Sequence, residues 1–166
     1  MKSLVLLTLL VIFTTSCSDH PEKVARRLPD TGQARSYAET FGDDGDYLIH
    51  PPSYTKLDKT GKDLPDSAEE WAMVRDNVTG LIWETKTDSG IRDKGRRFTW
   101  YNPNNATSGG HAGMAGDGTD TKDFIDALNA ETFGGFAAWR IPTVKELSTI
   151  VNSGSQHPAI HETYFV

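Results

Sequence analysis

Three aspartates at the end of a glycine-rich segment have the spacing that best suits metal chemistry. Asp117, Asp120 and Asp123 follow one another where residues 102–120, which hold five glycines and no apolar periodicity, come to an end. Calcium takes roughly six to eight oxygen ligands, and clustered carboxylates supply them. The spacing does not match the EF-hand pattern, and an alternative needs no metal: Asp120 caps a helix and Asp123 complements its dipole. Calcium at these three residues is the one cofactor that the sequence suggests.

Cys17 is the only cysteine, and it follows an apolar segment at the N-terminus. The run of residues 4–13 is too short to span a bilayer but suits the core of a signal peptide. Small residues before Cys17 resemble a bacterial lipobox, in which the cysteine is lipidated, although Thr14 stands where leucine is usual. We expect an exported lipoprotein, periplasmic or at the cell surface, whose membrane contact is the lipid on Cys17. Secretion without lipid is the alternative, and the terminal position disfavours a buried strand.

Nucleophilic catalysis finds little support in the residues. The chain has no Gly-x-Ser-x-Gly elbow, and Cys17 would lie on a tether outside the folded domain. The formal net charge is −6, whereas a protein that binds nucleic acid needs a cationic patch to displace counterions. Arg96 and Arg97 are too small a patch. We therefore expect no enzymatic activity and no nucleic-acid partner.

A motif late in the chain predicts a strand, a stop and a helix. Pro142 fixes φ and keeps Ile141 out of the helical region, so a helix must begin after it. Thr143 and Glu146 have the spacing of a capping box at that helix start. Arg140 is expected to be partly buried and bonded to carbonyls or a carboxylate, which is a structural role. Apolar residues on either side are predicted to be buried: Phe136, Trp139 and Ile141 before the stop, and Val144, Leu147, Ile150 and Val151 on one helical face.

Residues 71–84 are predicted to form a β-hairpin. Two short β-prone runs flank a turn-rich stretch, in which Asp76 and Thr79 favour a turn and Gly80 can adopt a positive φ. Proline cannot donate to a strand ladder, so Pro51 and Pro52 end any strand before them. Two further short strands are expected, at residues 47–49 and 98–101.

Residues 121–133 are predicted to form the first helix. Asp120 or Thr121 can cap it, and Gly134 lies where a glycine would end it. Its buried face would consist of Phe124, Ile125 and Leu128. Because one cysteine allows no internal disulfide, the fold must rest on aromatic packing. The expected supports of the core are Trp71, Trp83, Trp100 and Trp139.

The hairpin and the late motif together resemble the Lcl C-terminal domain family. Residues 74–84 and 134–147 carry the resemblance, and residues 30–33 resemble the element that often leads these domains. The resemblance implies a secreted or surface protein with a fold similar to C-type-lectin-like and formylglycine-generating-enzyme-like domains, and it brings no catalytic residue. The motif residues are Asp76, Thr79, Gly80, Trp83, Gly134, Gly135, Phe136, Trp139, Arg140, Pro142, Thr143 and Glu146.

Two departures from the family pattern matter. Ala138 stands where the family usually has aspartate before the Trp-Arg pair, so any contact of that carboxylate is missing. Family members normally continue through further strands beyond the point reached by residues 164–166. We therefore expect a domain that is incomplete at its C-terminus, with an unpaired sheet edge that invites association.

These features predict an α+β fold of the C-type-lectin-like type, with two helices packed on a small antiparallel sheet and long irregular loops. The expected order is a signal peptide in residues 1–16, a lipid-anchored tether in residues 17–27 and a domain in residues 28–166. Within that domain, residues 28–65 would be an irregular lead and residues 66–166 the core. The expected function is binding or adhesion to a carbohydrate or protein ligand. An envelope-enzyme remnant and a structural lipoprotein without small ligand are the alternatives.

Overall fold

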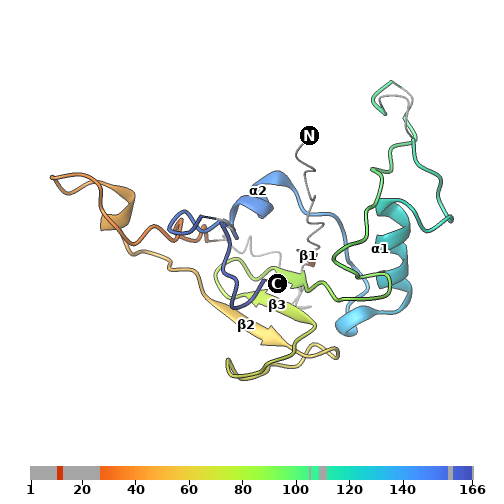
Figure 1. The fold of residues 1–166 in the computed structure, drawn as a ribbon, viewed down its shortest axis with the longest axis horizontal. Coiled ribbons are helices and arrows are strands. Elements are labelled where there is room, and N and C mark those ends of the chain that lie inside the picture. Colours follow the sequence, from red (N-terminus) through yellow and green to blue (C-terminus); the bar gives the residue numbers. More distant parts are fainter. Residues whose placement is uncertain (1–10, 13–26, 105, 109–111, 157–158, 166) are drawn as a thin grey trace, which may run out of the picture.

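A short antiparallel sheet lies at the centre of the fold (Figure 1). The computed structural model describes residues 11–12, 27–104, 106–108, 112–156 and 159–165. The strand order is β1-β4-β3-β2, with all neighbours antiparallel. Two short α-helices accompany this sheet, so the predicted α+β class is confirmed. The strands are β1 (Val11–Ile12), β2 (Tyr54–Leu57), β3 (Met73–Asp76) and β4 (Ile82–Glu84).

The predicted hairpin is formed by β3 and β4. Asp76 ends β3, and its buried carboxylate accepts hydrogen bonds from the Val78 N–H at 2.8 Å and the Thr79 hydroxyl at 2.6 Å. Gly80 has φ 73° and donates its N–H to the Asp76 carbonyl at 2.8 Å. Because a side chain is strained at this φ, glycine closes the turn at low cost. The turn residues therefore fix the register of the hairpin.

The strand expected at residues 47–49 is absent there, and a strand forms further along the chain instead. Leu48 and Ile49 are 81% and 67% exposed. The Asp30 carboxylate accepts the N–H groups of Ile49 and His50 at 2.9 and 3.0 Å, and it thereby occupies donors that a strand ladder would use. The strand is β2, beyond the two prolines, where three of four side chains are buried.

β1 adds two residues to the outer edge of β4, with Val11 opposite Trp83 and Ile12 opposite Ile82. These residues lie inside the segment predicted to be the core of a signal peptide, for which a buried strand is the disfavoured alternative. The structure places a two-residue strand there. Export and processing of the segment stay predictions.

Residues 98–101 do not form the predicted strand. An isolated bridge holds Thr99 beside the start of the first helix. The Thr99 N–H donates to the Thr119 carbonyl at 3.0 Å, and the Thr99 carbonyl accepts from the Thr121 N–H at 2.9 Å. Trp100 is 59% exposed, so the prediction that it supports the core is wrong. The segment braces a helix start and does not extend the sheet.

The first helix is α1 (Thr121–Ala130), which ends before residue 133, the predicted end. Asp120 is its N-cap, and Asp120 Oδ1 accepts the Asp123 N–H at 3.0 Å. The chain then reverses through a short 3₁₀ turn, η2 (Phe133–Gly135), in which Gly134 has φ 68°. Phe124 and Leu128 are fully buried, whereas Ile125 is half-buried.

The second helix, α2 (Val144–Ser148), begins at the predicted residue but has five residues. Its predicted apolar face is wrong in part, since Val144 is 82% exposed and Val151 is 43% exposed. The chain leaves the helix after Ser148, and the altered path turns Ile150 into the core. The segment before α2 is extended and irregular, without the predicted strand.

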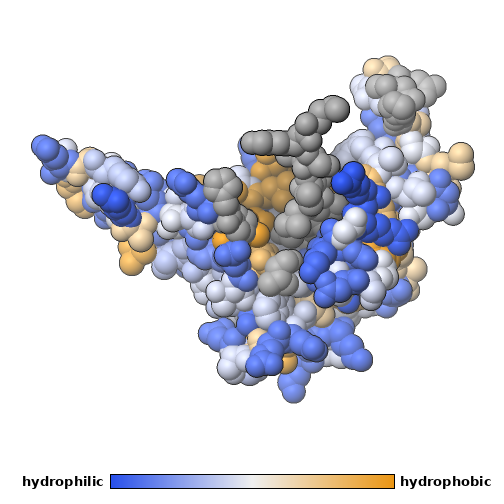
Figure 2. Space-filling model, in the orientation of Figure 1, coloured by the Kyte–Doolittle hydropathy of each residue, from blue (hydrophilic) through white to orange (hydrophobic). Residues whose placement is uncertain are grey.

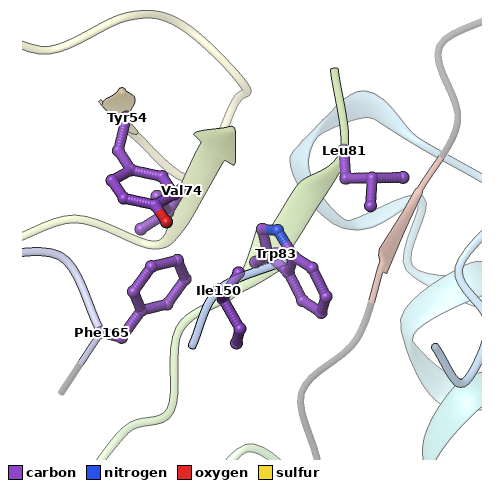
Figure 3. Packing of buried hydrophobic residues seen from close by; sticks show 6 residues of the cluster. All are labelled: Tyr54, Val74, Leu81, Trp83, Ile150 and Phe165. Atoms are coloured by element: carbon purple, nitrogen blue, oxygen red, sulfur yellow. The ribbon is translucent and has the colours of Figure 1, made fainter. Parts of the chain in front are cut away.

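Two hydrophobic clusters lie on opposite faces of the hairpin. Successive side chains of a strand point to opposite faces, so neighbouring residues of β3 and β4 enter different clusters. In the first cluster, the Tyr54 and Phe165 rings meet edge to face with centroids 5.1 Å apart (Figure 3). Trp83 and Trp139 support the core as predicted, 0% and 2% exposed. The first cluster comprises Tyr54, Val74, Leu81, Trp83, Ile150 and Phe165, and the second Leu57, Met73, Ile82, Phe124, Leu128 and Trp139.

Residues 28–50 form an arm that projects from the sheet (Figure 1). It is irregular apart from the 3₁₀ turn η1 (Asp44–Asp46). The predicted irregular lead extended to residue 65 and was wrong in part, because it included β2, whose Tyr54 and Leu57 belong to the core. At the base of the arm, the Ser153 N–H donates to the Thr31 carbonyl at 2.8 Å. Figure 2 shows hydrophobic and hydrophilic surface mixed along the arm. Its large apolar residues are 67% to 81% exposed at Leu28, Tyr37, Phe41, Leu48 and Ile49.

Candidate ligand-binding site

The late motif holds α1 and the following segment together. The Trp139 Nε1 donates to the Phe133 carbonyl at 3.0 Å. Asn129 of α1 clamps the backbone of Trp139: its Oδ1 accepts the Trp139 N–H at 2.7 Å, and its Nδ2 donates to the Trp139 carbonyl at 3.0 Å. The indole is buried, so Trp139 is a core residue and offers no platform for a ligand.

Arg140 connects the motif to α2 through Glu146. Its Nη1 and Nη2 donate to the two Glu146 carboxylate oxygens at 2.9 and 2.6 Å, and Nη1 also donates to the Ile141 carbonyl at 3.0 Å. Glu146 also accepts the Thr143 N–H at 2.8 Å, which completes the predicted capping box. The guanidinium and then the Thr143 donors lower the pKa of Glu146 to about 2. The predicted carbonyl and carboxylate contacts of Arg140 are confirmed.

The remaining motif residues serve close packing. A Cβ on Gly134 would lie 2.4 Å from the Met73 Cε and Sδ, so a larger residue would displace a fully buried side chain. Gly135 has φ 81°, Pro142 is buried and Phe136 is half-buried. The motif therefore sets the fold, and a surface for ligands must be sought elsewhere.

An open cleft of about 350 Å³ lies where the chain enters and leaves the hairpin. Residues 69–71 lead into β3, and residues 85–88 leave β4. The antiparallel pairing brings these segments side by side, and the Thr85 N–H donates to the Ala72 carbonyl at 3.1 Å. The cleft is lined by Glu69, Glu70, Trp71, Thr85, Lys86, Thr87 and Asp88.

Trp71 is the aromatic residue of the cleft wall, and it is half-buried. Its Nε1 donates to the Tyr164 carbonyl at 2.9 Å. The Lys56 ammonium lies 3.9 Å from the indole ring centre and donates to the carbonyls of Asp66 and Ala68 at 3.0 and 2.8 Å. These contacts fix the indole. Little side-chain entropy of Trp71 would therefore be lost when a ligand packs against it.

The accessible charge of the cleft is negative. The Lys86 ammonium lies 3.0 Å from Glu84 Oε2, and the two side chains are 6% and 0% exposed. Burial raises the pKa of Glu84, while Lys86 opposes this shift. Asp88 is exposed and lies 2.6 Å from the Lys94 ammonium. Within the described part of the chain, the exposed Glu69 and Glu70 make no recorded hydrogen bond or ion pair, so both can accept hydrogen bonds from a ligand.

The three aspartates predicted to bind metal lie together at the start of α1. One carboxylate oxygen from each of Asp117, Asp120 and Asp123 lies within 4.8 Å of the other two. Asp123 accepts the N–H groups of Gly116 and Gly118 at 2.6 and 2.7 Å, and these bonds lower its pKa. The alternative role of Asp120 as a helix cap is confirmed, whereas metal binding stays a prediction. Asp120 therefore both caps α1 and belongs to the cluster of three carboxylates.

The cleft was not predicted from the sequence. Trp71 was assigned to the core alone, and Glu69 and Glu70 were not singled out. A usable signal was present, because an acidic pair beside a tryptophan precedes the hairpin and polar residues follow it. Strand pairing places the two ends of a hairpin together.

Cys17 lies outside the described residues, so lipidation stays a prediction. Among the residues that are described, no helix is long and apolar enough to cross a membrane.

The fold and these sites define a small α+β domain built on a hairpin and a Trp-Arg-Ile-Pro motif. The family model of the Lcl C-terminal domain matches residues 72–166, more than half of the chain, and the protein belongs to this family. The match begins at the hairpin, so the resemblance noted at residues 30–33 lies outside it. No curated protein matches the chain. No solved structure matches it either.

Proposed function

We propose that the protein is a non-enzymatic binding module of the bacterial envelope and that the cleft beside Trp71 binds a carbohydrate. The supporting observation is a fixed, half-buried indole next to two exposed carboxylates. An indole face packs against the apolar C–H face of a sugar ring, while carboxylate oxygens accept hydrogen bonds from its hydroxyls. Small-ligand sites commonly combine an apolar wall with a few placed polar groups.

The charge of the cleft restricts the class of carbohydrate. Glu69 and Glu70 carry exposed negative charge, Asp88 is paired with Lys94, and the one lysine of the lining is paired with Glu84. Anionic polysaccharides would be repelled by this field, whereas neutral sugars and amino sugars would not. The ligand we propose is therefore a neutral or amino sugar.

A protein ligand is the second candidate, and the arm of residues 28–50 favours it. Five large apolar side chains of the arm are at least 67% exposed. Exposed apolar surface of this kind often marks contacts with other proteins. This surface lies in a different segment from the cleft lining, so substitutions can separate the two candidates.

A glycan binding screen on the purified full chain tests the proposal. Glu70→Gln removes an exposed charge and should weaken sugar binding about tenfold or more, since hydrogen bonds to charged groups contribute roughly 1.5–3 kcal/mol. Glu131→Gln, an exposed carboxylate at the end of α1, is the matched control and should bind normally. Equal binding by both variants, or capture of proteins without any glycan, would overturn the assignment of the cleft.

We further propose a lipid anchor at Cys17 and a C-type-lectin-like architecture. The apolar run before the lone cysteine supports the first, and the resemblance of the family supports the second by analogy. Two acyl chains anchor a protein firmly, whereas an unlipidated chain would be released. Cys17→Ser should therefore move the protein from the membrane fraction to the soluble fraction. A wild-type protein that is already soluble after fractionation contradicts the anchor.

A further inference from the structure

The acidic cluster at the start of α1 has the dimensions of a single-ion site. Ligand oxygens lie about 2.3–2.6 Å from Ca²⁺, so two oxygens on one ion are at most about 5 Å apart. The oxygens offered by Asp117, Asp120 and Asp123 meet this condition, since all lie within 4.8 Å of one another. The three residues are close in sequence at the start of α1. The local backbone therefore sets the distances between their side chains.

Asp120 supplies an observation that is independent of the clustering. Its side chain is 0% exposed, and its Oδ1 is used by the Asp123 N–H. The other oxygen, Oδ2, is buried and has no hydrogen-bond partner among the residues described. A buried carboxylate oxygen without a partner is costly, and the usual remedies are a donor, a proton or a cation. Oδ2 is the oxygen of Asp120 that remains free for an ion.

We propose that Asp117, Asp120 and Asp123 bind one Ca²⁺ ion, whose remaining ligands are water and oxygens of the neighbouring loop. Gly113 lets this loop approach, because a Cβ on Gly113 would lie 2.8 Å from Asp120 Oδ2. The ion joins the exposed Asp117 to the buried Asp120, and thereby ties residues 113–118 to α1.

Arg96 and Lys122 lie near the cluster and bond to groups other than its three carboxylates. Arg96 Nη2 donates to the Gly118 carbonyl at 2.7 Å, and the Lys122 ammonium pairs with Asp126 one helical turn away. The cluster keeps its excess of negative charge, which a divalent cation offsets. Ca²⁺ is favoured over Mg²⁺ because it accepts irregular coordination, whereas Mg²⁺ demands near-octahedral geometry.

Calcium titration of the purified full chain tests the site, by calorimetry and by thermal unfolding. We expect a Kd of about 10⁻⁴ to 10⁻³ M, the range of weak extracellular sites. Calcium at about ten times that Kd should raise the Tm by about 3–5 °C, and a chelator should reverse the shift. Magnesium and sodium chloride at matched ionic strength should shift the Tm by less than half as much.

Two substitutions locate the ion without removing the helix cap. Asp117→Asn keeps the Oδ1 that accepts from Thr119, and Asp120→Asn keeps a good N-cap. Each should weaken calcium binding at least about tenfold, whereas the matched control Asp126→Asn on α1 should not. No heat and no calcium-dependent shift in the wild type would overturn the proposal. Undiminished binding by both variants, or an equal effect of magnesium, would also overturn it.

Discussion

The starts of the two helices use the same capping chemistry and differ in how their charge is balanced. At α2, the Glu146 carboxylate that completes the Thr143 capping box is paired with Arg140, a residue outside the helix. At α1, the Asp120 cap lies among further carboxylates, and the neighbouring Lys122 pairs with Asp126 outside the cluster. Capping alone therefore does not set the electrostatics of a helix start. A neighbouring segment supplies the counter-charge in one case, and we propose that an ion supplies it in the other.

Removing the residue that connects the end of α1 to the Arg140 segment before α2 should have the largest effect. Trp139 is bonded to Asn129 of α1 and directly precedes Arg140. Trp139→Ala should lower the free energy of unfolding by about 3–5 kcal/mol, the range for a buried large aromatic. Chemical denaturation measures it. Trp100→Ala is the control and should change stability by less than about 0.5 kcal/mol, because Trp100 is 59% exposed. Equal effects of the two would mean that Trp139 is not a core residue.

Removing the positive charge of Arg140, which pairs with Glu146 at the start of α2, should have the next largest effect on stability. Arg140→Ala leaves the Glu146 carboxylate, 15% exposed, without its bidentate partner. Hydrogen bonds to charged groups contribute about 1.5–3 kcal/mol, so the free energy of unfolding should fall by that order. Arg140→Lys should recover only part of the loss, since lysine cannot form the two parallel bonds. Full recovery with lysine would show that charge alone, without geometry, is what matters at this helix start.

Loss of the cap itself should cost less. Thr143→Ala removes the hydroxyl that accepts the Glu146 N–H at 3.2 Å, and about 1 kcal/mol of stability should be lost. Thr143→Ser keeps that hydroxyl and should be close to wild type. A loss as large as that of Arg140→Ala would show that the cap, and not the ion pair, dominates at α2.

Lowering the pH should weaken the start of α2, because it protonates the Glu146 carboxylate that pairs with Arg140. The folded-state pKa of Glu146 is about 2, below its ordinary value of 4.5. The stabilisation is therefore complete above pH 4.5 and is lost as the pH falls towards 2. Across this window, Glu146→Gln should lose less stability than the wild type, as measured by thermal unfolding at each pH. Parallel curves for the two proteins would contradict the lowered pKa.

The features that the sequence predicted well are encoded by neighbouring residues. The Asp76 to Gly80 turn, the Thr143 capping box and the Asp120 cap each need contacts that span only a few positions. Local hydrogen bonds and φ preferences decide such elements, so spacing alone identifies them.

The features that were not predicted from the sequence depend on contacts between distant segments. The backbone donors of Ile49 and His50 are taken by Asp30, about twenty positions earlier, which no local pattern reveals. Val144 fits an apolar helical face, but only Leu147 and Ile150 of that face pack in the core, and Val144 is exposed. The cleft beside Trp71 likewise arises only when the two ends of the hairpin meet.

The contacts at the base of the arm determine how the domain responds to a pulling force. The Thr31 carbonyl holds Ser153, and Gly32 and Gly154 approach so closely that a Cβ on Gly154 would lie 2.7 Å from the Gly32 carbonyl oxygen. A pull applied at residue 27 first meets the bonds of Asp30 with Ile49 and His50 and the bond of Thr31 with Ser153, before it reaches β2. A few hydrogen bonds at the base carry that load, while the hairpin keeps its own ladder. Under tension the arm would peel away and lengthen the reach of the domain, leaving the cleft at the hairpin intact.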